Sequence, residues 1–479
     1  MRKEKIMLFS SVVFLFLFLP TVIFCYYIPG KKLKNTVLLI FSLFFYAYGE
    51  PKYLLVMLFS IVVNYILGLL LDKYRADNTK AKLILALAVI INISIIGYYK
   101  YANFLVENIN AVFKTSITIK DIVMPIGISF FTFQGLSYVI DIYRQNGKVQ
   151  KNPLNVALYI SFFPQLIAGP IVRYETVAEQ INKREESLDD FTYGVERFIL
   201  GLSKKVLIAN TVGLIADEVF SASTSDLSVL LVWLGILSYT AQIYFDFSGY
   251  SDMAIGLGRM FGFEFLENFN YPYISKSITE FWRRWHMSLG TWFRDYVYIP
   301  LGGNRVSKGK YFRNIFIVWF LTGLWHGASW NFIIWGLYYG CILTMEKLFW
   351  GKYLEKVWKP IQHIYTMFFI IIGWLFFRAE TLVQALEYLK IMFGFTEHTF
   401  INSQAIYYLK EYKFILILAA IATLPLYPSI KRKVEEISID SANIMIKNYV
   451  KPIILIGIFI LSISYLINST FNPFIYFRF

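Results

Sequence analysis

Apolar residues in this chain come in long runs instead of the two-residue alternation of a half-buried strand or the 3.6-residue spacing of a surface helix. A helix needs about 20 residues to cross the hydrocarbon core of a bilayer. Runs that approach or exceed this length lie near 7–28, 53–72, 82–100, 121–141, 228–247, 312–346, 360–378, 411–428 and 451–469. The run 312–346 has room for two helices. The pattern predicts an all-α protein that crosses a membrane many times.

Shorter or more polar segments at 35–49, 101–114, 154–171, 190–220 and 250–262 are predicted to be half-helices, re-entrant pieces or tilted spans. Gln165 stands between Pro164 and Pro170, which predicts a broken helix. The count comes to about eleven transmembrane helices within a single domain, 1–479. The first run has basic residues on both sides and no small-x-small cleavage site, so we expect a retained first helix of undetermined orientation.

Composition supports a polytopic membrane protein, because the chain is 57% hydrophobic and 16% charged, against about 45–50% and about 25% for soluble proteins. The formal net charge is +14, but the Lys and Arg residues cluster between the apolar runs. That distribution is typical of cytoplasmic loops and does not predict nucleic-acid binding. Two cysteines in apolar runs offer no disulfide framework or metal set. No P-loop, zinc-protease or serine-hydrolase motif is present.

The stretch 263–311 interrupts the apolar pattern with bulky aromatic and basic residues. We expect one amphipathic helix from Ser277 to Asp295, lying at the membrane interface. It carries Arg283, Arg284 and Arg294, and it also carries His286. A histidine among arginines at an interface has an ordinary explanation as a headgroup or solvent contact.

His326 lies in the apolar stretch "LTGLWHGASWNFIIWG" (321–336), between Gly323 and Gly327. Thirteen helical residues separate it from Arg313, which places it about 20 Å from the membrane boundary. An ionisable group at that depth indicates a function, although a neutral histidine bonding a neighbouring helix is the alternative. The two glycines predict either a helix-contact surface or room for a substrate.

The chain has only four histidines, and His286 and His326 flank one basic loop. A neutral imidazole is a suitable general base without a metal. It would deprotonate a hydroxyl that attacks a thioester, with Asn331 or tryptophan N–H groups supporting the oxyanion. A second polar set, Asp246, Ser248, Ser251 and Asp252, lies in an apolar run. It either lines a cavity or holds helices together.

Two blocks carry a resemblance to a known family, namely "YFDFSGYSDMAIGLGRMFGFEFLENFNYPYISKSITEFWRRWHMSLGTWFRDYVYIPLGGNR" and "LTGLWHGASWNFIIWGLYYG". They resemble the membrane-bound O-acyltransferases, in the bacterial branch that acetylates alginate, with the teichoic acid D-alanyl transferases more distant. "MPIGISFFTFQGLSYVIDIYR" and "SFFPQLIAGPIVRYE" are also similar. The resemblance implies that His326 is catalytic and that His286 is a second catalytic or supporting residue.

The same resemblance implies helices arranged around a central tunnel in the bacterial cytoplasmic membrane. An acyl thioester donor, acetyl-CoA for an acetyl group or an acyl carrier protein, would enter from the cytoplasm. The acyl group would pass outward to a partner acyltransferase and then to a polysaccharide acceptor. Neither a metal nor a bound cofactor is expected. Arg283, Arg284 and Arg294 suit the phosphate groups of the donor.

The C-terminal motif "FNPFIYFRF" (471–479) suits an aromatic anchor at the membrane interface. It also resembles the aromatic C-terminus of the companion peptide in teichoic acid D-alanylation. By that analogy Tyr476 is a candidate acyl relay, since a phenolic hydroxyl is a reasonable covalent carrier.

The sequence thus predicts a membrane O-acetyltransferase that modifies an extracellular or periplasmic polysaccharide. D-alanyl or other acyl transfer to a teichoic-acid-like polymer remains open. A lipid-linked glycan transporter and a scaffold subunit with inert histidines are alternatives from other classes.

Overall fold

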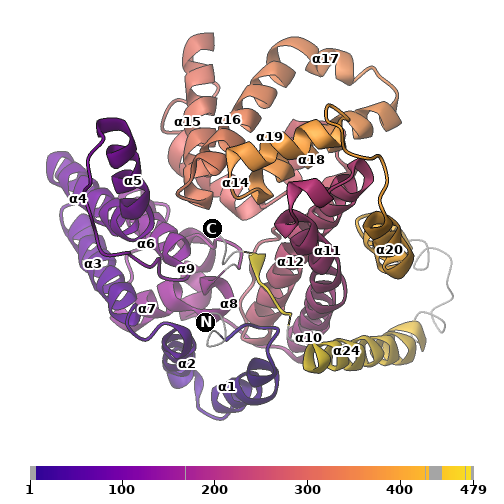
Figure 1. Cartoon of the computed structure of the whole chain (residues 1–479). Coiled ribbons are helices and arrows are strands. Elements are labelled where there is room, and N and C mark those ends of the chain that lie inside the picture. The colour runs from indigo at the N-terminus through magenta and orange to yellow at the C-terminus, as the bar shows by residue number, and fades with distance from the viewer. Residues whose placement is uncertain (1–6, 168, 427, 431–444, 470, 476–479) are drawn as a thin grey trace. The chain divides into compact units, whose positions relative to one another are not determined.

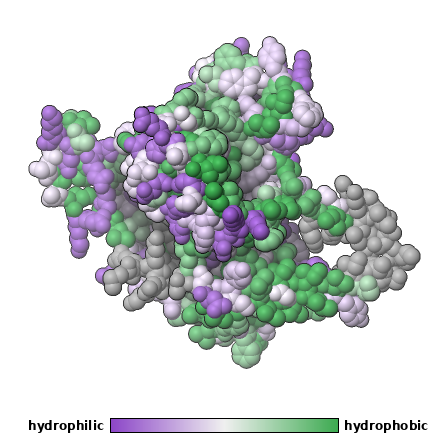
Figure 2. Space-filling view, turned by 45° about the vertical axis from the view of Figure 1, so that its right-hand side comes forward, coloured by the Kyte–Doolittle hydropathy of each residue, from purple (hydrophilic) through white to green (hydrophobic). Residues whose placement is uncertain are grey.

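The computed structural model describes residues 7–167, 169–426, 428–430, 445–469 and 471–475, and all regular secondary structure in these ranges is helical. Seven helical stretches within these ranges are long and apolar enough to cross a membrane. They are Leu54–Lys73, Asn78–Phe113, Leu188–Ser221, Val229–Met260, Trp330–Leu354, Lys359–Arg378 and Asn448–Asn468. Figure 2 shows hydrophobic side chains over much of the face in view, as expected of a surface that meets lipid.

The chain forms two compact units, of which the first comprises Met1–Phe198 and Ser251–Glu267. Its helices up to residue 198 are α1 (Leu19–Tyr27), α2 (Lys34–Gly49), α3 (Leu54–Lys73), α4 (Asn78–Ile96), α5 (Ala102–Phe113), α6 (Ile128–Arg144), α7 (Pro153–Ser161), α8 (Phe163–Leu166), α9 (Tyr174–Asn182) and the first part of α10 (Leu188–Ser203). Helices α3, α4 and α6 lie side by side (Figure 1). Asn64 and Asn92 exchange side-chain hydrogen bonds of 3.1 and 2.9 Å between α3 and α4. Such buried amide pairs hold apolar helices together.

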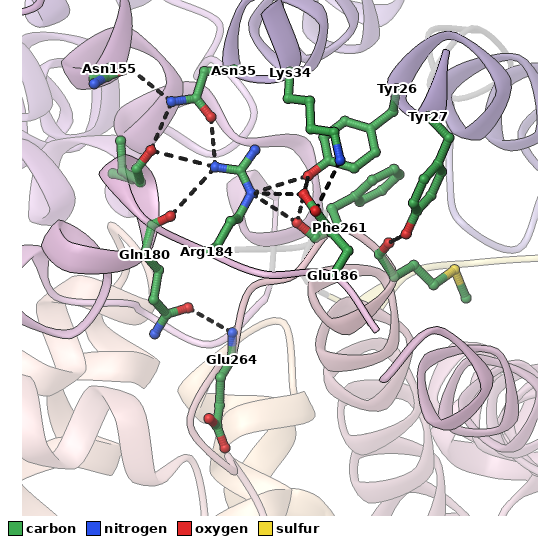
Figure 3. Close-up of polar contacts among 12 residues, drawn as sticks. Tyr26, Tyr27, Lys34, Asn35, Asn155, Gln180, Arg184, Glu186, Phe261 and Glu264 are labelled. Carbon is green, nitrogen blue, oxygen red and sulfur yellow. Dashed lines mark hydrogen bonds and ion pairs between the residues drawn. The ribbon is translucent and has the colours of Figure 1, made fainter. Parts of the chain in front are cut away.

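A polar cluster around Arg184 joins distant parts of this first unit (Figure 3). The Arg184 guanidinium donates to the Asn35 side-chain oxygen at 2.6 Å, to the Phe261 carbonyl at 3.0 Å and to the Tyr26 hydroxyl at 3.1 Å. Glu186 accepts a hydrogen bond from Tyr26 and pairs with Lys34 at 2.9 Å. Segments separated by up to 235 residues in sequence meet here, and the fork of the guanidinium connects them.

The second unit comprises Ile199–Tyr250 and Asn268–Phe479. It contains α11 (Asn210–Ser221), most of α12 (Val229–Met260), α13 (Ile278–Arg284), α14 (Met287–Phe293), α15 (Lys308–His326), α16 (Trp330–Met345), α17 (Gly351–Leu354), α18 (Lys359–Arg378), α19 (Leu382–Met392), α20 (Ser403–Glu411), α21 (Lys413–Ala422) and α24 (Lys451–Asn468). Both histidines singled out in the sequence belong to this unit.

Several predicted boundaries are confirmed. The run 312–346 forms two helices, α15 and α16, with a break at residues 327–329. A break at Phe162 separates α7 from α8, close to Gln165. The length of the run predicted the first break, and the prolines on either side of Gln165 predicted the second.

Other predicted boundaries are wrong. The runs 228–247 and 250–262 form one 32-residue helix, α12. The segment 190–220 lies within the 34-residue span Leu188–Ser221, which agrees with the tilted span that was one of its predicted alternatives. The charged residues Asp246 and Asp252 do not end α12, because they pair with Lys205 and Arg197 of the span Leu188–Ser221. The first predicted span, 7–28, is helical over 12–27, and the run 411–428 is helical only in part. The helix expected over 121–141 begins at Ile128.

Candidate active site

His326 is the last residue of α15, which ends where Gly327 adopts an extended conformation. The helix is continuous from Arg313 to His326, so the predicted separation of about 20 Å along its axis holds. The residue is 8% exposed. Its ring packs edge-on against Trp325, Trp335 and Phe377, with centroids 5.0, 5.0 and 5.1 Å away. Three aromatic side chains therefore hold the imidazole in one orientation.

Glycines set the close approach of α15 and α16 that holds His326 in place. A Cβ at Gly323 would lie 2.4 Å from the Phe332 carbonyl oxygen, and one at Gly336 would lie 2.3 Å from that of Trp319. Such distances are too short for any side chain. A Cβ at Gly327 would lie 2.3 Å from the Phe332 ring. The glycine pair beside His326 thus serves packing within the chain.

A narrow apolar cavity adjoins His326. Its described lining consists of Ile243, Phe247, Trp285, His326, Trp335, Trp374, Phe377 and Ile475. His326 is the one titratable side chain in this described lining. Polar interactions are stronger in such surroundings than in water. A reacting carbonyl placed here would therefore respond strongly to the imidazole.

His286 interrupts the single helix predicted from Ser277 to Asp295, so that prediction is wrong. The segment forms α13 and α14, and His286 lies between them with φ 44° and ψ 52°. This left-handed conformation is unfavourable for a non-glycine residue by roughly 1–2 kcal/mol. Hydrogen bonds from outside the segment stabilise the break: Met287 N–H donates to the Asn268 carbonyl at 2.9 Å.

The side chain of Asn268 determines which nitrogen of His286 carries the proton. Its Oδ1 atom accepts the backbone N–H of Ser288 at 3.2 Å, which identifies this atom as the oxygen. The same oxygen lies 3.1 Å from His286 Nδ1. Nδ1 must therefore be the donor, which leaves Nε2 as the basic nitrogen. Burial lowers the pKa of His286 to about 3, so the ring stays neutral at physiological pH.

The two histidines, forty residues apart in sequence, contact the same indole ring. Trp325 lies 5.8 Å from the His286 ring and 5.0 Å from the His326 ring, measured between centroids. Phe247, which lines the cavity, also packs on His286 at 4.6 Å. His286 itself is not among the described lining residues, so it lies behind the cavity wall.

The other residues predicted for the site lie apart from the described cavity lining. Arg283 is exposed, Arg284 pairs with Glu280 at 2.9 Å, and Arg294 pairs with Asp295 at 2.7 Å. Asn331 donates to the Ala379 carbonyl at 2.7 Å. The roles expected of these side chains in binding the donor or supporting an oxyanion stay predictions. Tyr476 lies outside the described residues.

Sequence reasoning missed Asn268 and Lys205, and it left the role of Asp246 undecided. Lys205 and Asp246 form a buried ion pair at 2.6 Å. A lysine inside the apolar segment 190–220 was a detectable signal, since charges in spanning helices are costly. For Asn268, in the polar stretch "ENFNYP", no signal distinguished it from its neighbours.

Comparison with known proteins gives consistent matches. Residues 148–386, which include both histidines, match the model of the membrane-bound O-acyltransferase family. The chain is 46% identical over 396 residues to probable alginate O-acetylase AlgI of Pseudomonas aeruginosa, covering 81% of this chain and 75% of that protein. It is 39% identical over 424 residues to peptidoglycan O-acetyltransferase of Helicobacter pylori, covering 81% and 80%.

A more distant match is teichoic acid D-alanyltransferase of Bacillus subtilis, 33% identical over 262 residues that cover 52% of this chain and 65% of that protein. The long apolar helices and these matches together identify an integral membrane protein.

Proposed function

Since this chain belongs to the membrane-bound O-acyltransferase family and is an acyltransferase, we propose that it carries an acetyl group across the bacterial cytoplasmic membrane for O-acetylation of a polysaccharide. The donor is acetyl-CoA or another acyl thioester on the cytoplasmic side. About eleven membrane segments surround a central tunnel that leads to His326. Alginate and peptidoglycan, named for the relatives, define the class of acceptor.

The observation that carries this proposal is the position of His326 in an aromatic cavity with Ile475 on its wall. Ile475 precedes Tyr476 in the sequence, and this adjacency supports Tyr476 as the relay that His326 serves. An apolar wall limits water, which protects a thioester or an acyl ester from hydrolysis.

The transfer proceeds with His326 as general base. Its imidazole takes the proton from the Tyr476 hydroxyl as the phenolic oxygen attacks the thioester carbonyl carbon. A carbon–oxygen bond forms, the carbon–sulfur bond breaks, and the leaving thiolate takes the proton from the imidazolium. The products are an acetyl ester on Tyr476 and the free thiol. General-base catalysis of this kind contributes about 10²–10⁴-fold to a rate.

His286 assists from behind the cavity wall as a neutral ring held by Asn268. Arg283, Arg284 and Arg294 attract the phosphate groups of the donor, a role for which guanidinium groups are well suited. Asn331 has a second amide hydrogen besides the one bonded to Ala379, and that hydrogen supports the oxyanion. An extracytoplasmic partner acyltransferase then takes the acetyl group from Tyr476 and delivers it to the polysaccharide.

A second candidate is D-alanyl transfer to a teichoic-acid-like polymer. The similarity to teichoic acid D-alanyltransferase favours it, but that match is less identical and covers less of the chain. Acetyl-CoA and a D-alanyl thioester supplied as competing donors separate the two functions. Labelling by the D-alanyl donor alone would favour the second.

The experiment that tests acyl transfer is incubation of the purified full-length protein with isotopically labelled acetyl-CoA, followed by mass spectrometry. We expect label on the protein and loss of at least about 10²-fold in labelling rate in His326→Ala. His398→Ala is the matched control, because His398 bonds to Thr396 and Thr224, outside the cavity. Full polymer acetylation in cells that carry His286→Ala and His326→Ala together would show that the chain is a scaffold with inert histidines.

A further inference from the structure

The end of the described chain is held by a buried ion pair between two residues of the second unit, which lie on the long helical spans Leu188–Ser221 and Val229–Met260. Lys205 Nζ and Asp246 Oδ1 are 2.6 Å apart, and their side chains are 3% and 2% exposed. Replacing such a pair by apolar residues is often neutral or stabilising, so a buried pair is weak evidence for a role in stability. The presence of the Lys205–Asp246 pair therefore calls for an explanation other than stability.

Each member of the pair has a second partner in the C-terminal segment. Lys205 Nζ donates to the Pro473 carbonyl oxygen, and Asp246 Oδ2 accepts the Ile475 backbone N–H at 2.8 Å. The cation binds a carbonyl and the anion binds an amide. The pair therefore binds the main chain of residues 473–475. The positive group faces a hydrogen-bond acceptor and the negative group faces a donor, so the charges could not be exchanged without loss of both contacts.

Further contacts hold the same segment. The Asn210 amide donates to the Asn472 side-chain oxygen at 3.2 Å, and the ring of Phe474 stacks on Tyr250 with centroids 4.6 Å apart. Phe474 and Ile475 are each 3% exposed. Residues 472–475 are thus bound by side chains of α11, α12 and the π-helical turn Lys204–Ala209.

Local geometry brings the two charges together. A Cβ at Gly249 would lie 2.7 Å from the Gly201 carbonyl oxygen and 3.1 Å from the Lys205 nitrogen. Gly249 stands three residues after Asp246, on the same helix face. The missing side chain therefore lets α12 approach the turn that carries Lys205. Turns of π-helix inside α-helices are frequent at functional sites.

From this geometry we infer that Lys205 and Asp246 are positioning residues for acyl transfer, which hold the main chain of residues 473–475 so that Ile475 stays on the wall of the His326 cavity. The inference rests on the proposed function, since it gives the anchored segment the task of presenting the acyl acceptor. Ile475 lines the cavity, so the residue whose backbone N–H binds Asp246 also forms part of the cavity wall.

The decisive variant exchanges the two charges, Lys205→Asp with Asp246→Lys. It restores an ion pair but places an anion at the Pro473 carbonyl and a cation at the Ile475 amide. If the ion pair only stabilises the fold, the exchanged pair should restore the wild-type behaviour. If the pair holds the main chain of residues 473–475, the exchanged pair should not restore it. We expect normal expression and donor binding, with labelling of Tyr476 by isotopic acetyl-CoA lowered by about 10²-fold, as for a misplaced reacting group. Labelling of Tyr476 at the wild-type rate overturns the inference.

A readout independent of acyl transfer is digestion of the full chain with carboxypeptidase Y, followed by intact mass measurement. In the wild type we expect Ile475 and all residues before it to survive digestion, whereas the exchanged variant should lose residues 472–475. The matched control is Asp217→Asn, which removes a different, partly buried ion pair, with Arg378 at 2.9 Å, and should be digested as the wild type is. Equal digestion of wild type and exchanged variant overturns the inference.

The isosteric Asp246→Asn serves if the exchanged variant does not fold. It keeps an oxygen near the Ile475 amide but loses the attraction for Lys205, so digestion should again pass Asn472, and wild-type resistance overturns the inference. Protection of the wild-type chain end without acetyl label on Tyr476 overturns the proposed relay and with it the positioning role.

Discussion

The Nδ1 atom of His286 donates a hydrogen bond to the side-chain oxygen of Asn268, 3.1 Å away. The oxygen is identified by a backbone N–H that bonds to it. This relationship keeps the basic lone pair on Nε2, in a ring that burial keeps neutral.

Asn268→Leu should therefore lower the rate of acetyl transfer, because the ring loses the partner that selects its tautomer. We expect a loss of about 10–100-fold, by analogy with the loss seen when the hydrogen-bond partner of a metal-binding histidine is removed. The initial rate of labelling by isotopic acetyl-CoA measures it. Ser288→Ala is the control, since it removes a hydroxyl from the same oxygen but leaves Asn268 bonded to His286. Equal losses in both variants would contradict a role in tautomer selection.

The pH dependence of stability should report the buried neutral state of His286. Its pKa in the folded protein is about 3, below the usual 6.5 or so of an unfolded chain. Between these values the unfolded state binds one more proton than the folded state. His286 therefore makes the free energy of unfolding fall by about 1.4 kcal/mol for each pH unit below about 6.5.

Unfolding of the detergent-solubilised protein between pH 4 and pH 8 measures that slope. In His286→Gln, which cannot take up a proton, the decline toward acid should be shallower by about this amount. Parallel curves for the wild type and the variant would show that His286 is protonated in the folded protein as readily as in the unfolded chain.

Gly336→Ala should destabilise the second unit and reduce activity. The new methyl would lie 2.3 Å from the Trp319 carbonyl oxygen, so α16 must move away from α15, which carries His326. Overpacking of this kind costs about 1–3 kcal/mol. Thermal unfolding and the acetyl-transfer rate measure the two effects. Gly340→Ala, one turn later, meets its nearest neighbour at 3.4 Å and should behave as the wild type does.

Arg184→Met should destabilise the first unit, because the Phe261 carbonyl and the Asn35 side-chain oxygen lose the donor that joins them (Figure 3). Leaving buried acceptors without this donor costs about 1–3 kcal/mol. Thermal unfolding checks it, with Lys183→Met as the control, since Lys183 is the exposed neighbour. Comparable losses of stability in both variants would rule out the cluster as the cause.

The amino-acid sequence was enough to predict the helical membrane class and the two helices within 312–346. It also singled out His326 as a candidate functional residue. These features depend on local composition: a long apolar run forms a helix in lipid whatever its neighbours are, and a histidine within such a run is conspicuous. For Gly323 the sequence allowed either a helix-contact surface or room for a substrate. The Phe332 carbonyl oxygen, which lies where a side chain would stand, shows that it is a helix contact.

Only the tertiary structure decided the break at His286, the contact of both histidines with Trp325 and the anchoring of the chain end by Lys205 and Asp246. Each depends on partners far away in sequence, as Asn268 is for His286 and Asp246 is for Ile475. Backbone propensity alone favours a continuous helix through residue 286, because a left-handed histidine is unfavourable until hydrogen bonds from another segment stabilise it. Likewise the merged helix α12 tolerates Asp246 in its apolar run because a lysine on another helix neutralises that charge.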